Sequence, residues 1–213
     1  MRDATRILAI RHGETAWNAE MRMQGQLNTP LNDAGRWQAS RLAAVIGDEP
    51  IDAIYASDLD RALHTALPLA NATGKPVLTE RGLRERAFGV FEGHAYTEID
   101  RRWPEPAMRW RMRDLHFGPE GGESLHGFNQ RCIQTAERLV ADHAGHTIVW
   151  VTHGGVLDCL YRMATRVALD APRTWSLGNA AINRLLYADQ GLMLIGWGDS
   201  QHLTALDADD SNR

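Results

Sequence analysis

Four segments of the sequence place reactive side chains after short apolar runs. Arg11 and His12 follow a run near the N-terminus, and His153 ends the most hydrophobic run of the chain. Arg61 and Glu85 come shortly after two further runs. Arginine binds phosphate through several planar N–H donors, histidine can attack phosphorus as a nucleophile, and a carboxylic acid can protonate a departing oxygen. These residue types together are suited to phosphoryl transfer.

The spacing of apolar residues predicts strands that alternate with helices. The predicted strands span residues 6–11, 51–57, 75–80, 146–153, 180–189 and 191–198. The predicted helices span residues 34–46, 58–74, 123–145 and 154–169. Asp33 is the expected N-cap of the first helix. Pro68 is expected to bend the second helix or to lie at an adjusted turn.

This alternation predicts a three-layer αβα sandwich with a mostly parallel sheet. The last two strands are joined by a short turn that contains glycine, so they should form a hairpin and one strand should be antiparallel. We expect residues 1–205 to form a single domain with a helical insertion at about residues 86–120. Residues 206–213 are acidic and polar and should form a disordered tail.

In open α/β sheets, ligands bind beyond the carboxyl ends of the strands. The five reactive residues should therefore meet at one edge of the sheet. Gly154 and Gly155 open a helix directly after His153, and the N–H groups at its start would point to the same place. A bound phosphate would then neutralise Arg11 and His12, although a structural ion pair at the strand end stays an alternative.

Composition narrows the class of protein. The chain has 213 residues, of which 44% are hydrophobic, and a net charge of −4, which argues against nucleic-acid partners. No apolar run approaches the ~20 residues that span a bilayer, and the N-terminus does not resemble a signal peptide. Cys132 and Cys159 lack a CxxC partner and are expected to be buried thiols. We therefore expect a cytoplasmic protein without a metal site.

Several motifs carry a resemblance to a known family. The segments RHGETAWN, RMQGQLNTPLNDAGRWQA, YASDLDRALHTA, LRERAFGVFEG, GGES and VTHGG occur in the order typical of the histidine phosphatase superfamily. The sequence resembles its phosphoglycerate mutase-like group over about residues 6–190. The resemblance implies that His12 is the nucleophile, forming a phosphohistidine, and that Glu85 is the proton donor. It implies that Arg11, Arg61 and a protonated His153 hold the phosphoryl group without a metal or other cofactor.

The resemblance also implies further ligand contacts. Asn18 matches a side chain that contacts the phosphoryl group, and Gln24 and Gly154 match flanking contacts. His12 should keep its attacking nitrogen unprotonated, with the other nitrogen bonded to a backbone carbonyl.

Hydrolysis and phosphoryl return to a sugar acid are both possible outcomes in this family. The family's mutases carry a tyrosine three residues after the catalytic glutamate, where this chain has Phe88, and a longer segment with basic residues. The insertion holds Arg101, Arg102, Arg109, Arg111 and Arg113, which could grip an acidic substrate or form a solvated helical face. Trp103 and Trp110 could line the pocket mouth or pack in the core.

We therefore predict hydrolysis of a small-molecule phosphate monoester, whose identity the sequence does not give. One alternative is a phosphoglycerate mutase primed by 2,3-bisphosphoglycerate. Another is a non-catalytic protein that binds a phosphorylated ligand. An exposed sheet edge would allow a homodimer.

Overall fold

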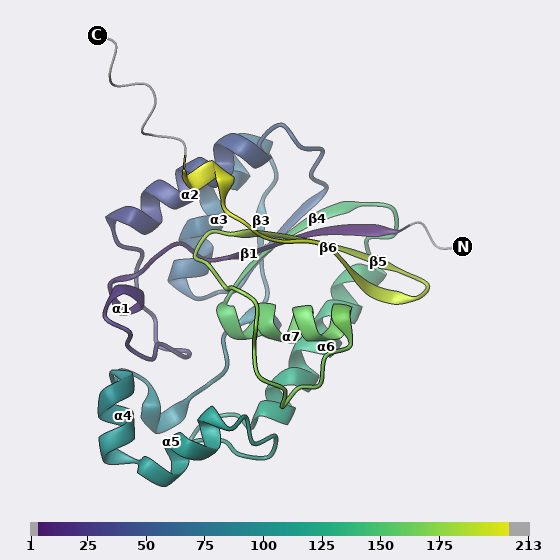
Figure 1. Ribbon diagram of the computed structural model, residues 1–213. Helices are drawn as coiled ribbons and strands as arrows, with labels where there is room; N and C mark the ends of the chain where they lie inside the picture. Colours follow the sequence, from purple (N-terminus) through teal and green to yellow (C-terminus); the bar gives the residue numbers. More distant parts are fainter. Residues whose placement is uncertain (1–3, 205–213) are drawn as a thin grey trace.

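The computed structural model describes residues 4–204, so the predicted tail at residues 206–213 lies outside the described residues. The centre of the fold is a six-stranded sheet in the order β3-β2-β4-β1-β5-β6 (Figure 1). The strands are β1 (Thr5–Arg11), β2 (Ala53–Ala56), β3 (Val77–Thr79), β4 (Thr147–Thr152), β5 (Ile182–Ala188) and β6 (Gly191–Asp199). β3 is shorter than predicted because Pro76 has no N–H to donate to a neighbouring strand.

The strands run mostly in one direction. β1, β2, β3 and β4 form parallel pairs, whereas β5 is antiparallel to both of its neighbours, β1 and β6. The β5–β6 hairpin turns at Gly191, whose φ of +89° lies in the left-handed region that favours glycine. The predicted mostly parallel sheet with one antiparallel strand is confirmed.

Helices cover both faces of the sheet, as predicted (Figure 1). The helices are α1 (Ala16–Ala19), α2 (Asp33–Ile46), α3 (Asp60–Thr73), α4 (Tyr96–Arg102), α5 (Pro104–Arg111), α6 (Leu125–Ala141) and α7 (Gly154–Thr165). Successive side chains of a strand point to opposite faces. Leu8 and Ile10 of β1 join the apolar cluster under α2 and α3, and Ile7 and Ala9 join the cluster under α6 and α7. Within residues 4–204, none of the helices has the length and apolar character needed to cross a membrane.

Helix ends differ from the prediction at α2, α6 and α7. α6 spans Leu125–Ala141 instead of residues 123–145. Asn32 is the N-cap of α2, because its side-chain oxygen accepts a hydrogen bond from the backbone N–H of Gly35 at 2.8 Å. Asp33, the predicted cap, is the first residue of the helix. α7 is shorter than predicted, because Arg166 leaves the helix with a φ of +60°. Pro68 lies inside α3, which continues beyond it.

The segment around residues 86–120 forms a small apolar core together with Met23. It contains α4, α5 and a short 3-10 helix, η2 (Gly89–Phe91). The cluster consists of Met23, Phe91, Ile99, Ala107 and Phe117. In Figure 1, α4 and α5 lie beyond the end toward which β1 runs, below α1. This segment therefore lies at the edge of the sheet where the reactive residues were predicted to meet.

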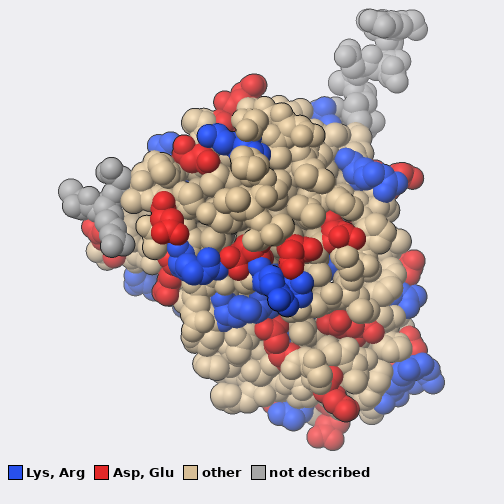
Figure 2. All heavy atoms as spheres, turned by 180° about the vertical axis from the view of Figure 1, so that it is seen from behind, with Lys and Arg blue, Asp and Glu red and all other residues tan. Residues whose placement is uncertain are grey.

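Charges of both signs are interspersed on the face shown in Figure 2. Lysine and arginine side chains lie among aspartates and glutamates there. The positive side chains on this face therefore have acidic neighbours that offset their charge.

Candidate active site

The two histidines predicted for the site lie side by side. β1 pairs with β4 in the middle of the sheet, and Arg11 is the partner of Thr152 in that register. His12 and His153 follow directly after these strands, and their ring centroids are 5.1 Å apart. The pairing of two strands far apart in the sequence therefore creates the histidine pair.

His12 is held in the tautomer that a nucleophile needs. Its Nδ1 lies 2.7 Å from the backbone carbonyl oxygen of Gly13. Because a carbonyl oxygen can only accept, Nδ1 carries the proton and the lone pair is on Nε2. The predicted bond from His12 to a backbone carbonyl is therefore present.

Two buried guanidinium groups lie close to this pair. Arg61 is 1% exposed, and its terminal nitrogens donate to the backbone carbonyls of Leu27 at 2.8 Å and Gly25 at 2.7 Å. Arg11 donates to the backbone carbonyl of Leu177. Within residues 4–204, neither guanidinium has a salt bridge, and the Nε of each is buried without a hydrogen-bond partner. Backbone carbonyls thus orient both groups, and the nearby carboxylate of Glu85 acts on them through charge without forming a salt bridge in the described residues.

His153 adds a third nitrogen of this kind. Its ring is completely buried, and its Nε2 lies 2.8 Å from the hydroxyl oxygen of Ser57. Its Nδ1 is buried without a partner in the described part of the chain. Buried polar atoms are normally hydrogen-bonded. Unpartnered nitrogens of Arg11, Arg61 and His153 near the His12 ring therefore indicate a binding site for a small anion.

Both histidines are neutral near physiological pH in this structure. Burial lowers the pKa of His12 well below its usual range, and the charges of Arg61 and Arg11 lower it further. Burial, Arg61 and His12 lower the pKa of His153 in the same way. A neutral His12 is ready to attack. The expected protonated His153 is not the state found here, and a phosphoryl dianion beside the ring would favour protonation.

These lowered pKa values predict that stability falls on acidification. An unfolded histidine takes up a proton near pH ~6.5, whereas His12 and His153 stay neutral in the fold. Below that pH the unfolded chain binds more protons, so each ring can reduce the free energy of unfolding by up to about 1.4 kcal/mol per pH unit. Urea titrations between about pH 7.5 and 5.5 measure this slope. His12→Ala should flatten it, and an unchanged slope would contradict the lowered pKa of His12.

Glu85 is held by the backbone at the start of α7. Its Oε2 accepts a hydrogen bond from the N–H of Gly155 at 3.0 Å, and its Oε1 accepts one from the N–H of Arg86 at 2.9 Å. A Cβ atom on residue 155 would lie 2.1 Å from Oε1, so glycine is needed there. Arg131 donates to the backbone carbonyl of Glu85 at 3.2 Å. The carboxyl group of Glu85 is thus fixed at the N–H of Gly155, which is two residues after His153 in the sequence.

Asn18 and Gly154 also lie at this edge of the sheet. Asn18 closes a capping box with Thr15 at the start of α1. Asn179, which lies in the loop before β5, donates both to the Asn18 side-chain oxygen and to the carbonyl of His12. Gly154 begins α7, and a Cβ atom placed on it would lie 3.6 Å from Nε of Arg11. The structure therefore brings both predicted contacts to the histidine pair.

Gln24 is connected to the site less directly. Its side-chain oxygen accepts a hydrogen bond from the hydroxyl of Thr29 at 2.6 Å. The next residue, Gly25, presents its carbonyl to Arg61. Among the described residues, the Gln24 amide makes no hydrogen bond to another predicted site residue.

Four of the five arginines of the insertion form ion pairs with acidic residues. Arg102 pairs with Glu98, Arg109 with Asp114, Arg111 with Asp100 and Arg113 with Asp158. Trp103 and Trp110 pack against Phe91 with ring centroids 5.7 and 6.3 Å away. Arg102, Arg109 and Arg111 are partly exposed, as the alternative of a solvated helical face predicts. Both tryptophans pack against the apolar cluster, as the alternative of core packing predicts.

Two hydroxyl residues that the sequence analysis did not assign support the site. Ser57 contacts His153, as described above. The Thr65 hydroxyl accepts a hydrogen bond from the N–H of Gly13 at 2.9 Å and donates to the carbonyl of Arg61 at 2.7 Å. Ser57 ends the predicted strand 51–57. A polar residue at the end of a predicted strand is also the signal that identified His153.

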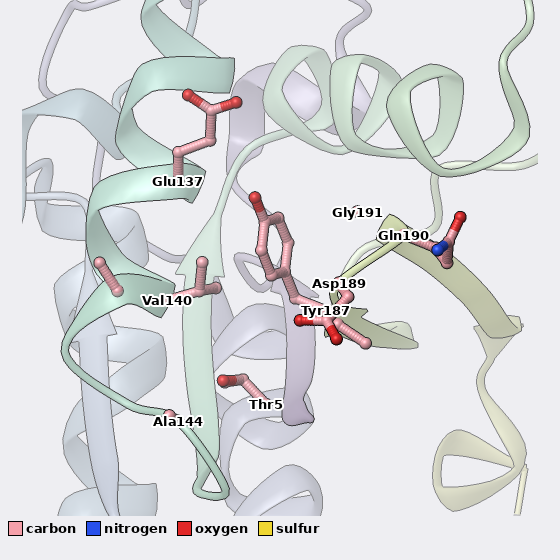
Figure 3. A pocket seen from close by; sticks show the side chains of 10 residues that line it. Thr5, Glu137, Val140, Ala144, Tyr187, Asp189, Gln190 and Gly191 are labelled. Carbon is pink, nitrogen blue, oxygen red and sulfur yellow. The ribbon is translucent and has the colours of Figure 1, made fainter. Parts of the chain in front are cut away.

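A separate hollow of about 460 Å³ lies at the opposite edge of the sheet. Thr5, Glu137, Tyr187 and Asp189 are among its lining residues. Figure 3 shows Tyr187 rising from the sheet toward α6, which carries Glu137. Thr5 begins β1 whereas Arg11 ends it, so this hollow is not the site around His12.

Comparison with known proteins agrees with this geometry. The family model of the histidine phosphatase superfamily (branch 1) matches residues 7–200. Phosphoglycerate mutase-like protein 4 of Arabidopsis thaliana is 42% identical over 207 residues, which cover 94% of this chain and 88% of that protein. The metal-independent phosphoserine phosphatase of the same plant is 36% identical over 209 residues, covering 96% and 85%.

A solved structure shows the same likeness. The native structure of a mycobacterial glucosyl-3-phosphoglycerate phosphatase superposes with a TM-score of 0.83 at 32% identity, covering 92% of this chain and 100% of that one. The region that the family model matches, residues 7–200, includes every predicted site residue. The chain therefore belongs to branch 1 of the histidine phosphatase superfamily.

Proposed function

We propose that this protein hydrolyses a small phosphate monoester through a phosphohistidine on His12. The observation that carries the proposal is the set of buried nitrogens beside the His12 ring that have no hydrogen-bond partner within residues 4–204. Catalysis of phosphoryl transfer depends mainly on positioning and on neutralising charge on the phosphoryl oxygens. Arg11, Arg61 and His153 would supply both.

The reaction takes two steps. Nε2 of His12 attacks phosphorus, the bond from phosphorus to the ester oxygen breaks, and Glu85 gives its proton to that oxygen. The Glu85 carboxylate then removes a proton from water, the water oxygen attacks phosphorus, and the bond to His12 breaks to release inorganic phosphate. The same carboxyl group is thus acid first and base second.

Two features of the structure and the names of two similar proteins favour hydrolysis over mutase activity. Phe88, at the position of the mutases' tyrosine, has no hydroxyl, and its ring packs edge-on against Trp110. Four arginines of the insertion are engaged with acidic partners, as described above, rather than free to hold a second acidic group. Two of the similar proteins are named as phosphatases, of phosphoserine and of glucosyl-3-phosphoglycerate. Mutase activity stays the second candidate because another similar protein is named phosphoglycerate mutase-like.

Phosphorus NMR on one sample separates these candidates. The sample contains the protein, 3-phosphoglycerate and a trace of 2,3-bisphosphoglycerate. Growth of inorganic phosphate supports the phosphatase, and phosphoserine, an alkyl phosphate and 4-nitrophenyl phosphate then define its preference. Growth of 2-phosphoglycerate without inorganic phosphate would show a mutase and overturn the proposal.

Glu85→Gln should slow hydrolysis most for esters with poor leaving groups. An alkoxide needs a proton as it departs, and general acids contribute about 10²- to 10⁴-fold. A nitrophenolate leaves without one, so its ester should be slowed less. Comparing kcat/KM for 4-nitrophenyl phosphate and an alkyl phosphate measures this difference. Equal slowing of both esters would contradict the role of Glu85.

EDTA should leave the rate of hydrolysis unchanged. Two buried guanidinium groups already supply the positive charge that a metal ion gives to phosphoryl oxygens in other enzymes. The measurement is the rate after overnight dialysis against EDTA, with and without added Mg²⁺ or Zn²⁺. A loss that a metal ion restores would contradict charge neutralisation by arginine.

A further inference from the structure

Asn179, in the loop before β5, forms a hydrogen bond to the backbone of the nucleophile His12. Nδ2 of Asn179 donates to the backbone carbonyl of His12 at 2.9 Å and lies 3.3 Å from Oδ1 of Asn18. The N–H of the next residue, Ala180, donates to the carbonyl of Arg11 at 3.0 Å. The loop is thus anchored to the end of β1, and one amide nitrogen bridges the nucleophile and Asn18.

The hydrogen bonds of Asn18 determine which way its amide faces. Its Oδ1 accepts from the backbone N–H and the hydroxyl of Thr15, each at 3.1 Å, and from Asn179. An amide oxygen has two lone pairs, so these donors occupy it. Among residues 4–204, Nδ2 of Asn18 has no hydrogen-bond partner. That nitrogen is the atom able to donate to an anion, whereas a reversed amide would present an oxygen and repel it.

We propose that Asn179 is a positioning residue, which holds the Asn18 amide with its nitrogen toward the phosphoryl group and at a set distance from His12. This inference rests on the proposed function, in which Asn18 contacts that group. Thr15 holds the Asn18 oxygen from within α1. Among residues 4–204, Asn179 is the side chain whose hydrogen bonds join the Asn18 oxygen to the backbone of His12.

A double-mutant cycle tests this role. Asn179→Ala should lower kcat/KM for 4-nitrophenyl phosphate by about tenfold, the loss expected for a misplaced hydrogen-bond donor. Asn18→Ala should lower it at least as much. The double variant should be no slower than Asn18→Ala, because Asn179 has nothing left to orient. Fully additive losses would overturn the proposal.

Asn183 provides a matched control. Its Nδ2 donates to the carbonyl of Ala9 at 2.9 Å, and its Oδ1 accepts from the N–H of Gly198 at 2.8 Å. It is buried in β5, and within residues 4–204 it makes no hydrogen bond to Asn18. Asn183→Ala should lower Tm yet leave kcat/KM within about twofold. A loss of activity as large as that of Asn179→Ala would indicate a general structural effect and overturn the proposal.

Binding of inorganic phosphate separates this inference from the proposed function. Calorimetry should give a Kd about tenfold weaker for Asn179→Ala than for wild type. If wild type binds phosphate but hydrolyses no ester, the proposed function fails while the binding cycle still tests Asn179. Asn179→Asp, which has the same size but no N–H donor, should weaken phosphate binding at least as much. Unchanged binding in both folded variants would overturn the positioning role.

Discussion

His12→Ala should hydrolyse phosphate esters at least about 10⁴-fold more slowly than wild type. The variant loses the atom that forms the covalent intermediate, and the neighbouring ring does not replace it. Nε2 of His153 lies against the hydroxyl of Ser57, so this ring nitrogen is already engaged in another contact. Release of inorganic phosphate over hours measures the residual rate. Acid quenching after mixing with a phosphorus-labelled ester should trap label on wild type and none on the variant.

His64→Ala is the control for loss of a histidine. His64 lies in α3, one turn after Arg61, and its side chain is exposed. This variant should keep wild-type turnover and a trapped phosphoenzyme. Turnover by His12→Ala within tenfold of wild type would contradict the covalent mechanism.

Gly155→Ala should reduce kcat by about 10²- to 10³-fold, within the range that general acids contribute. The added methyl group would lie 2.1 Å from Oε1 of Glu85 and 3.1 Å from a ring carbon of Phe128. Phe128 is buried in the core, so the carboxyl group has to move instead. The N–H of residue 155 then loses its acceptor. As with the direct change at Glu85, esters with poor leaving groups should be slowed most.

Gly154→Ala is the matched comparison for this change. A Cβ atom on residue 154 meets ordinary contacts of 3.6–3.8 Å, to Arg11 and Leu177. Gly154→Ala should reduce kcat much less than Gly155→Ala does, although both substitutions add one methyl group to the same helical turn. Equal losses, or a Gly155→Ala enzyme with normal kcat, would contradict the fixed position of Glu85.

The sequence predicts the histidine pair because the apolar run that marks each strand, and so each strand end, is a local pattern. β4 is buried along its whole length and gives way directly to a helix, so His153 is marked as a strand-end residue. The same reasoning places Arg11 and His12 after β1. Strand direction also follows from local patterns, because helices between strands imply parallel pairs and a short glycine turn implies a hairpin.

Other features depend on contacts between distant segments. Arg113 forms an ion pair with Asp158 on α7. Because these two residues are far apart in the sequence, the run of arginines did not reveal that this charge is offset. Asn179 lies in an irregular loop without apolar periodicity, and it becomes relevant only because β5 pairs with β1. The neutral state of His153 likewise results from burial beside Arg61, a property of the packed molecule.

The central place of β1 in the sheet has a consequence for how the protein is made. Arg6 pairs with Thr147 on one side and with Leu186 on the other. A chain that emerges from the ribosome N-terminus first therefore exposes the strand leading to His12 long before either partner exists. Such non-local pairing slows folding and leaves apolar strands open to aggregation. His12 is therefore synthesised well before His153, the residue that completes the phosphate pocket.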